Sequence, residues 1–168
     1  YLLETLKDLE DFSNFEIYYY HIGGGTELED LIRFSKKLNF KRFKTFFLGK
    51  ISNLKLNNFF KESPIDVFLN VSSFEGTPLA LIEAMSYSIP VVVTKIGGNT
   101  SIGNYCNTNL SLNFKANELY YYFKKINYNK EYQEKLKSKS HSYWLNYHDS
   151  GSLSLKTQKI FQNIIFNK

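Results

Sequence analysis

The chain has 168 residues, 43% of them hydrophobic and 22% charged, which suits one packed domain and excludes a disordered or fibrous protein. Its 21 basic and 16 acidic residues give a formal net charge of +5, but only Arg33 and Arg42 are arginines, and the lysines lie among acids. Because arginine is the residue that reads phosphates and base edges, we expect no binding to nucleic acid. The one cysteine, Cys106, excludes an internal disulfide, and no apolar run approaches the roughly 20 residues of a transmembrane helix.

Helical and strand patterns alternate along the first part of the chain. Leucines at helical spacing predict a helix over residues 2–11, and an aromatic run predicts a strand over residues 15–22 that ends at three glycines. Thr26 is predicted to begin the next helix as its N-cap, with Glu29 completing a capping box. A second strand and a short helix follow, over residues 43–48 and 54–60.

The same alternation continues in the second part. Strands are predicted over residues 66–71, 89–94 and 110–112, with a helix over 78–87 between the first two. Beyond residue 115 the pattern is helical in three segments, which break near residues 127–129 and 149–151.

Short apolar strands that alternate with helices are typical of an α/β protein with a doubly wound, Rossmann-like parallel sheet and helices on both faces. No internal repeat and no long linker interrupts the pattern, so residues 1–168 are predicted to form one domain, with 113–168 as a helical C-terminal tail. Ligands of such sheets bind beyond the carboxyl ends of the strands. The loops at residues 22–26, 49–53, 72–78 and 95–103 are therefore the candidates for a site.

Glycines occupy two of these loops. Gly23, Gly24 and Gly25 would allow a phosphate to approach main-chain amides, but their spacing fits neither a dinucleotide fingerprint nor a P-loop. Acids in the following helical turn would also repel a phosphate, so a tight turn that borders a ligand cleft is the favoured interpretation. Gly97 and Gly98 again allow close approach of a ligand, and by themselves predict only a turn.

The segment from Ser72 to Met85 carries the strongest signal. Thr77 is predicted as the N-cap of a helix and Pro78 as its first residue, which would leave the amides of Leu79 and Ala80 free to bind an anion.

Two carboxylates flank this helix start. Glu75 lies in the loop, and Glu83 lies in the helix among apolar residues, where a buried and unpaired carboxylate would be costly. Carboxylates accept hydrogen bonds from hydroxyls and amides donate to phosphates, so the set would suit a phosphorylated ligand rich in hydroxyls. The alternative left open is that Glu75 is an ordinary loop acid and Glu83 belongs to a solvated stripe.

The stretch VFLNVSSFEGTPLALIEAMSYSIPVVVTKIGG, in which seven residues separate Glu75 from Glu83, resembles the signature of the group-1 (family 4) glycosyltransferases. HIGGGTELEDL, FFLGKISN and WLNYHDSGSLSLKTQKIF resemble other parts of that family, so the resemblance covers nearly the whole chain. It departs at Ser88, where the family usually has Gly, and at Ser101, where Glu is common. The resemblance implies the C-terminal, donor-binding half of a GT-B fold, without its first strand.

The resemblance also implies roles for individual residues. Glu75 would contact the hydroxyls of the donor sugar near the reacting carbon, and Glu83 would hold the ribose hydroxyls. The backbone of Gly76, Thr77, Leu79 and Ala80 would line the sugar and diphosphate, Lys50 and Ile51 would hold the base, and Gly23, Gly24, Gly25, Gly97 and Gly98 would border the cleft. Because the family is metal-independent and the chain has no Asp-x-Asp, we expect no metal and no cofactor besides the donor itself.

Together these expectations describe part of a retaining hexosyltransferase. It would move a sugar from a nucleoside diphosphate sugar to a saccharide or lipid-linked acceptor, in the biosynthesis of surface polysaccharide. The acceptor would bind a missing N-terminal domain, and the diphosphate-binding Arg and Lys of the family would precede Tyr1, so this chain alone would be inactive. We expect a cytoplasmic protein, or one bound peripherally at the inner face of the cell membrane.

Other functions remain as alternatives. One is a non-catalytic module that binds nucleotide sugars, and another is a GT-B relative such as a sugar-nucleotide epimerase. A third, an unrelated dinucleotide-binding domain, is disfavoured because no G-x-G-x-x-G occurs.

Overall fold

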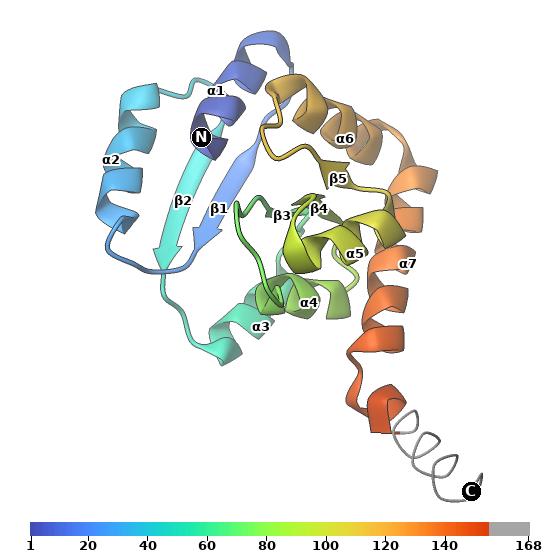
Figure 1. Cartoon of the computed structure of the whole chain (residues 1–168). Coiled ribbons are helices and arrows are strands. Elements are labelled where there is room, and N and C mark those ends of the chain that lie inside the picture. The colour runs from blue at the N-terminus through green and yellow to red at the C-terminus, as the bar shows by residue number, and fades with distance from the viewer. Residues whose placement is uncertain (155–168) are drawn as a thin grey trace, which may run out of the picture. The chain divides into compact units, whose positions relative to one another are not determined.

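The structure is a computed structural model that describes residues 1–154 (Figure 1). It confirms the predicted alternation of helices and strands. The elements are α1 (Leu2–Phe12), β1 (Tyr18–Ile22), α2 (Leu28–Leu38), β2 (Lys44–Gly49), α3 (Asn53–Glu62), β3 (Phe68–Asn70), α4 (Leu79–Ser86), β4 (Val91–Thr94), α5 (Gly97–Cys106), β5 (Asn109–Leu110), α6 (Ala116–Tyr128) and α7 (Lys130–Tyr147).

Every strand pair is parallel, as predicted, and the strands form two hydrogen-bonded groups, β1–β2 and β3–β4–β5. The chain packs into two compact units. The first consists of Tyr1–Pro64 and Asn113–Phe123, and the second of Ile65–Leu112 and the described residues from Lys124 onward.

The first unit is built on the β1–α2–β2 crossover. Leu3, Leu6 and Leu9 follow one another at helical spacing along α1 and are buried, which confirms the amphipathic helix predicted there. The segment from residue 113 packs against this helix although it is distant in sequence. The rings of Tyr1 and Phe114 meet edge to face with centroids 5.2 Å apart.

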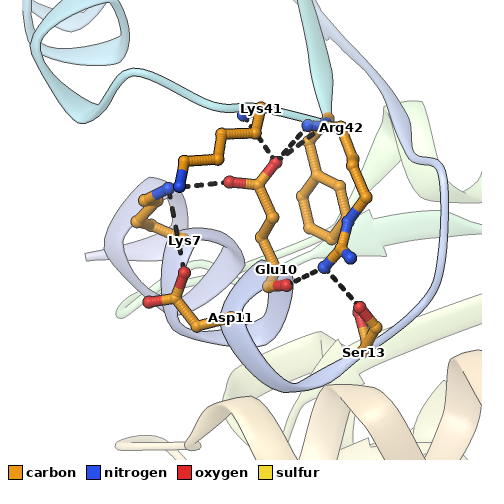
Figure 2. Close-up of polar contacts among 7 residues, drawn as sticks. Lys7, Glu10, Asp11, Ser13, Lys41 and Arg42 are labelled. Carbon is orange, nitrogen blue, oxygen red and sulfur yellow. Dashed lines mark hydrogen bonds and ion pairs between the residues drawn. The ribbon is translucent and has the colours of Figure 1, made fainter.

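A buried carboxylate fastens α1 to the turn before β2 (Figure 2). Glu10 is 2% exposed, and its Oε1 atom accepts hydrogen bonds from three successive backbone amides, those of Lys41, Arg42 and Phe43, at 2.8, 2.6 and 2.9 Å. The Nζ atom of Lys7 lies 2.7 Å from the other oxygen. Each oxygen of this carboxylate therefore meets at least one donor, as a buried charge requires.

The surroundings of Glu10 set its protonation. Burial acts to raise its pKa, but the hydrogen bonds from Lys7 and from the three amides favour the ionised form and together lower the pKa from 4.5 to about 2. Arg42 completes the fastening, because its guanidinium donates to the backbone carbonyls of Glu10 and Ser13.

The second unit is built on β3–α4–β4–α5–β5, with α7 packed against α4 and α5. All four residues of β4 are buried, as expected of the central strand of a parallel sheet. Its core also contains Cys106, whose burial raises the pKa of the thiol to about 11. Buried members of this core come from α4, β4 and α5, namely Leu81, Ile82, Met85, Val91, Val93, Ile102 and Cys106.

One helix was not predicted. The residues after β4 were expected to form only a turn, but Gly97 begins α5, a helix of 10 residues. Glycine, asparagine, threonine and serine are poor helix formers, so propensity gave no signal there. Tertiary packing stabilises the helix instead, because one face of α5 is buried, with Asn99, Ile102, Gly103 and Cys106.

The start of α5 lies against the loop that carries Glu75. A Cβ atom on Gly97 would come within 1.8 Å of the Glu75 carbonyl oxygen, and one on Gly98 within 2.1 Å of the Gly76 carbonyl oxygen. The Gly98 amide donates to the Glu75 carbonyl at 3.2 Å. The two glycines are therefore required by close backbone approach, and Gly97 also adopts a positive φ of 46°.

The C-terminal region is helical as predicted. α6 and α7 are separated at Asn129, which caps α7 by accepting a hydrogen bond from the Tyr132 amide, and a further helical segment begins at Ser150. Both predicted breaks are therefore present, whereas the part of the predicted tail over residues 155–168 lies outside the described residues.

Glu10→Gln should lower the free energy of unfolding by about 1.5–3 kcal/mol, because hydrogen bonds to a charged group are the stronger kind. A depressed pKa means that the ionised carboxylate stabilises the fold above pH 4.5 and that this contribution is lost as the pH falls toward 2. Urea denaturation of the full chain between pH 7 and pH 2 measures both effects. Asp11→Asn is the control, since Asp11 is 71% exposed and lies 3.9 Å from Lys7, and a change within about 0.5 kcal/mol is expected. An equally small loss for both variants would contradict the account of Glu10.

Gly98→Ala should destabilise the chain by about 1–3 kcal/mol, although alanine normally favours a helix, because the new methyl group would overlap a backbone carbonyl. Gly76→Ala is the control, since no atom lies within 4 Å of the added Cβ. Urea denaturation of both variants tests the close approach, and a Gly98→Ala protein at least as stable as the original would exclude it.

Candidate functional site

The carboxylate of Glu75 is half-buried in the loop after β3. Its Oε2 atom accepts a hydrogen bond from the Nδ2 atom of Asn70 at 3.3 Å, and the Ser72 hydroxyl lies 3.3 Å from the same oxygen. The Ser72 hydroxyl is closer to the Oδ1 atom of Asn70, at 2.8 Å, and has one proton to donate. The Oε1 atom of Glu75 has no hydrogen-bond partner within residues 1–154.

The backbone of this loop is fastened from β4 and α5. The Thr94 hydroxyl donates to the Ser72 carbonyl at 2.7 Å, and the Asn99 side-chain amide donates to the Asn70 carbonyl at 3.5 Å. Thr94 and Asn99 are both buried. Together with the bond from the Gly98 amide to Glu75, these contacts fix the loop at three points along its length.

The beginning of α4 differs from the prediction. Pro78, not Thr77, is the N-cap, and no side chain caps the helix. The Leu79 amide is not free, because it donates to the Thr77 carbonyl at 2.9 Å, which closes a tight turn that the sequence did not indicate. The first helical hydrogen bond runs from Ile82 to Pro78 at 3.0 Å, so the amides of the preceding first turn lie outside the helical ladder.

Glu83 lies on the exposed face of α4. Its neighbours in sequence are buried, but Glu83, Ala80 and Leu79 are exposed and lie within one helical turn of one another. The carboxylate has no ion pair and no hydrogen bond to any residue that the structure describes. Gly76 and Thr77, before the helix, are exposed as well, so the predicted donor-binding residues form one accessible strip that runs from the loop to Glu83.

The other predicted loops belong to the first unit. The Gly23 amide donates to the Gly49 carbonyl at 2.9 Å, and a Cβ atom on Gly24 would lie 3.4 Å from the Cβ atom of Lys50. The structure therefore brings the glycine loop beside Lys50, which is exposed, whereas Ile51 is half-buried. Gly24 and Gly25 line an open cavity of about 770 Å³ with His21 and with one side of α2, from Leu28 to Lys37.

The capping box predicted at the start of α2 is wrong. The helix begins at Leu28 with Glu27 as its N-cap, no side chain caps it, and Thr26 is exposed in the turn before it. The positive φ of Gly25, 140°, leads the chain into that turn, which a hydrogen bond from the Leu28 amide to the Gly25 carbonyl closes at 3.3 Å.

Sequence reasoning missed the residues that support Glu75. Asn70 ends an otherwise apolar strand, and a polar side chain there is a signal that could have been noticed. Thr94 ends β4 in the same way, but Asn99 lies on the helix that was not predicted, so no pattern pointed to it.

Two features are absent from the described residues. No three acids, histidines or cysteines among residues 1–154 gather closely enough to hold a metal ion. No helix in that part of the chain combines the length and apolar character needed to cross a membrane.

Comparisons with solved structures show the fold. The catalytic domain of cholesterol-alpha-glucosyltransferase from Helicobacter pylori matches with a TM-score of 0.70 and 19% identity, over 86% of this chain and 89% of that one. A mutant of S. aureus TarM, solved in complex with Fondaparinux, alpha-GlcNAc-glycerol and UDP, matches with a TM-score of 0.74 and 20% identity, over 95% of this chain and 32% of that one. The predicted fold, half of a GT-B enzyme, is confirmed.

Sequence comparisons show the family. The O-antigen biosynthesis glycosyltransferase WbnH of Escherichia coli is 35% identical over 78 residues, which are 46% of this chain and 20% of that relative. The family model of the glycosyl transferases group 1 matches residues 1–143. That match covers most of the sequence, including both glutamates and the loops around them, and the chain therefore belongs to the group 1 glycosyltransferases.

Proposed function

We propose that this chain is the donor-binding part of a retaining hexosyltransferase that acts in the biosynthesis of surface polysaccharide. The observation that carries the proposal is the accessible strip of the second unit, in which a half-buried Glu75 is followed by an exposed helix start and an exposed Glu83. The O-antigen glycosyltransferase among the relatives supports the biological setting.

Glu75 would receive the sugar of the donor. Its Oε2 atom is occupied by Asn70, whereas Oε1 is free to accept a hydrogen bond from a sugar hydroxyl. Glu83, one helical turn beyond the start of α4, would accept hydrogen bonds from the two ribose hydroxyls, for which an exposed and unpaired carboxylate is suited.

The start of α4 would meet the diphosphate between sugar and ribose. The amides of its first turn lie outside the helical ladder, and the positive end of the helix dipole favours an anion. With Leu79 bonded to Thr77, the amide of Ala80 takes the role first expected of both residues, while Leu79, Gly76 and Thr77 line the site. Fixed donors of this kind would stabilise the charge that develops on the departing diphosphate, so we propose mainly electrostatic catalysis.

The other predicted residues have supporting roles in the proposal. In the first unit, Lys50 and Ile51 would hold the nucleotide base beside the glycine loop at Gly23–Gly25, where a Cβ atom on Gly24 would lie 3.4 Å from the Cβ atom of Lys50. Gly97 and Gly98 would act by letting the Glu75 loop pack on α5, rather than by touching the donor themselves.

The acceptor would bind elsewhere in the protein. The chain spans 20% of the length of the curated relatives that it matches, so we propose that a part outside these residues binds a saccharide or lipid-linked acceptor. This chain alone would then bind donor and transfer no sugar. A lipid-linked acceptor would place the whole protein at the inner face of the cell membrane, as a peripheral and otherwise cytoplasmic enzyme.

Glu83→Gln and Glu75→Gln should have different effects. Loss of the Glu83 charge should weaken the binding of a nucleoside diphosphate by about 1.5–3 kcal/mol, or roughly 10–150-fold, because the ribose hydroxyls lose a charged acceptor. Glu75→Gln should leave that affinity within about twofold and abolish transfer by the complete protein, since its partner is the sugar. Calorimetric titration with UDP and with GDP, followed by a transfer assay, measures both.

The control for these variants is Glu131→Gln, which removes an exposed carboxylate from the first turn of α7 and should change neither quantity. Small and equal effects of Glu83→Gln and Glu75→Gln would exclude the proposed site, even though the family and the fold would stand.

Donor binding should not need a divalent metal ion, because both glutamates are assigned to hydroxyl groups and the sequence contains no Asp-x-Asp. Titration of UDP and GDP should therefore give the same affinity, within about twofold, in EDTA and in excess Mg²⁺ or Mn²⁺. Binding that disappears in EDTA and returns with the metal would contradict the proposal.

A further inference from the structure

We propose that Asn70 is a positioning residue for Glu75, and that it presents the Oε1 atom of the carboxylate to the donor sugar by holding the Oε2 atom. The inference rests on the proposed function, because it gives Asn70 a task only if Glu75 contacts the sugar. Asn70 itself would touch no substrate.

The side-chain amide of Asn70 has one orientation that satisfies its neighbours. Its Oδ1 atom accepts from the Ser72 hydroxyl at 2.8 Å and lies 3.4 Å from the Ser72 amide, so this end of the side chain is occupied by donors. Its Nδ2 atom must then point the other way, where it donates to the Oε2 atom of Glu75 at 3.3 Å. An amide that is fixed at one end in this way can orient a carboxylate at the other.

The backbone of Asn70 is also held in place. The residue ends β3, where it lies opposite Val93 in the parallel ladder, and its carbonyl accepts from the buried Asn99. The Glu75 backbone is held separately by the Gly98 amide. With both main chains fixed, the bond between the two side chains decides which way the carboxylate points.

A purely structural role of Asn70 would need only one end of its side-chain amide. If Asn70 only closed the turn to Ser72, it would use the Oδ1 atom alone, and aspartate would serve as well as asparagine. The Nδ2 donor is needed only for Glu75. Asn70→Asp therefore separates the two roles, because it keeps the acceptor for Ser72 and places a second carboxylate where the donor stood, about 3.3 Å from Oε2.

The experiment uses the complete protein that contains this chain. Turnover is measured with UDP-glucose, UDP-galactose, UDP-N-acetylglucosamine and GDP-mannose, and the most active of these becomes the probe. The binding readout is a ratio of two dissociation constants, the Kd of the bare nucleoside diphosphate divided by the Kd of the nucleotide sugar. This ratio reports how much the sugar adds to the affinity, and it can be measured in inactive variants. Thermal melting reports any loss of stability.

Asn70→Asp and Asn70→Ala should each lower kcat at least tenfold and reduce the affinity that the sugar adds, while the Kd of the bare nucleoside diphosphate stays within twofold. In a Glu75→Gln background, the same substitutions should change that added affinity less than twofold, because the carboxylate on which Asn70 acts is absent. Ser72→Ala, which removes one hydroxyl, gives a milder variant for the same cycle. Asn104→Asp, at an exposed position near the end of α5, is the matched control and should change nothing.

Each outcome decides between the possibilities. The inference is overturned if Asn70→Asp keeps kcat within twofold, or if its effect is equally large with and without the Glu75 carboxylate. It is also overturned if the loss of kcat in the Asn70 variants only parallels their loss of melting temperature, and if their affinity for the bare nucleoside diphosphate falls by the same factor as their affinity for the nucleotide sugar. If Glu75→Gln itself leaves turnover unchanged, the proposed function fails first, and the two failures are therefore distinguishable.

Discussion

The candidate site depends on the close approach of two backbone segments. The loop at Glu75 and Gly76 lies directly on the first turn of α5, where side chains at Gly97 and Gly98 would overlap its carbonyl oxygens. This approach allows the Gly98 amide to hold the Glu75 carbonyl and brings α5 near enough for Asn99 to reach Asn70. The backbone that carries the Glu75 carboxylate is thus held by hydrogen bonds from β4 and α5 rather than left as a free loop, and such preorganisation suits the electrostatic catalysis that we propose.

In the first unit, two segments distant in sequence are joined by a side chain rather than by close backbone approach. The buried carboxylate of Glu10 on α1 accepts hydrogen bonds from three backbone amides of the turn before β2. The hydrogen bonds distinguish these two glutamates. Every oxygen of Glu10 is occupied by donors of the protein, whereas Glu75 keeps one oxygen without a partner in the described chain. Glu10 therefore supports the fold, whereas the Oε1 atom of Glu75 is left as an acceptor for the sugar that we propose there.

The sequence was sufficient for the features that depend on periodicity and motif. Leucine spacing predicted α1, apolar strands predicted the parallel pairing, and the spacing of Glu75 and Glu83 led to the family. It failed where tertiary contacts override local preference. α5 forms despite poor helix formers, and the caps expected at Thr26 and Thr77 are replaced by backbone turns. Ser88 adopts a positive φ of 61°, which explains why glycine is usual at that position in the family it resembles.

Polar residues at the ends of β3 and β4 were visible in the sequence, but their joint support of the Glu75 loop could not be predicted, because only the fold brings them together with Asn99 of α5. In the proposed function this supported carboxylate binds the sugar of the donor, and Glu83 binds its ribose. A crystal structure of the complete protein with a bound nucleoside diphosphate sugar tests these two contacts most directly. We expect ribose hydroxyls about 3 Å from the Glu83 carboxylate and a sugar hydroxyl at the same distance from the Oε1 atom of Glu75. A nucleotide sugar that leaves Glu83 in solvent and contacts neither carboxylate would exclude the proposed site.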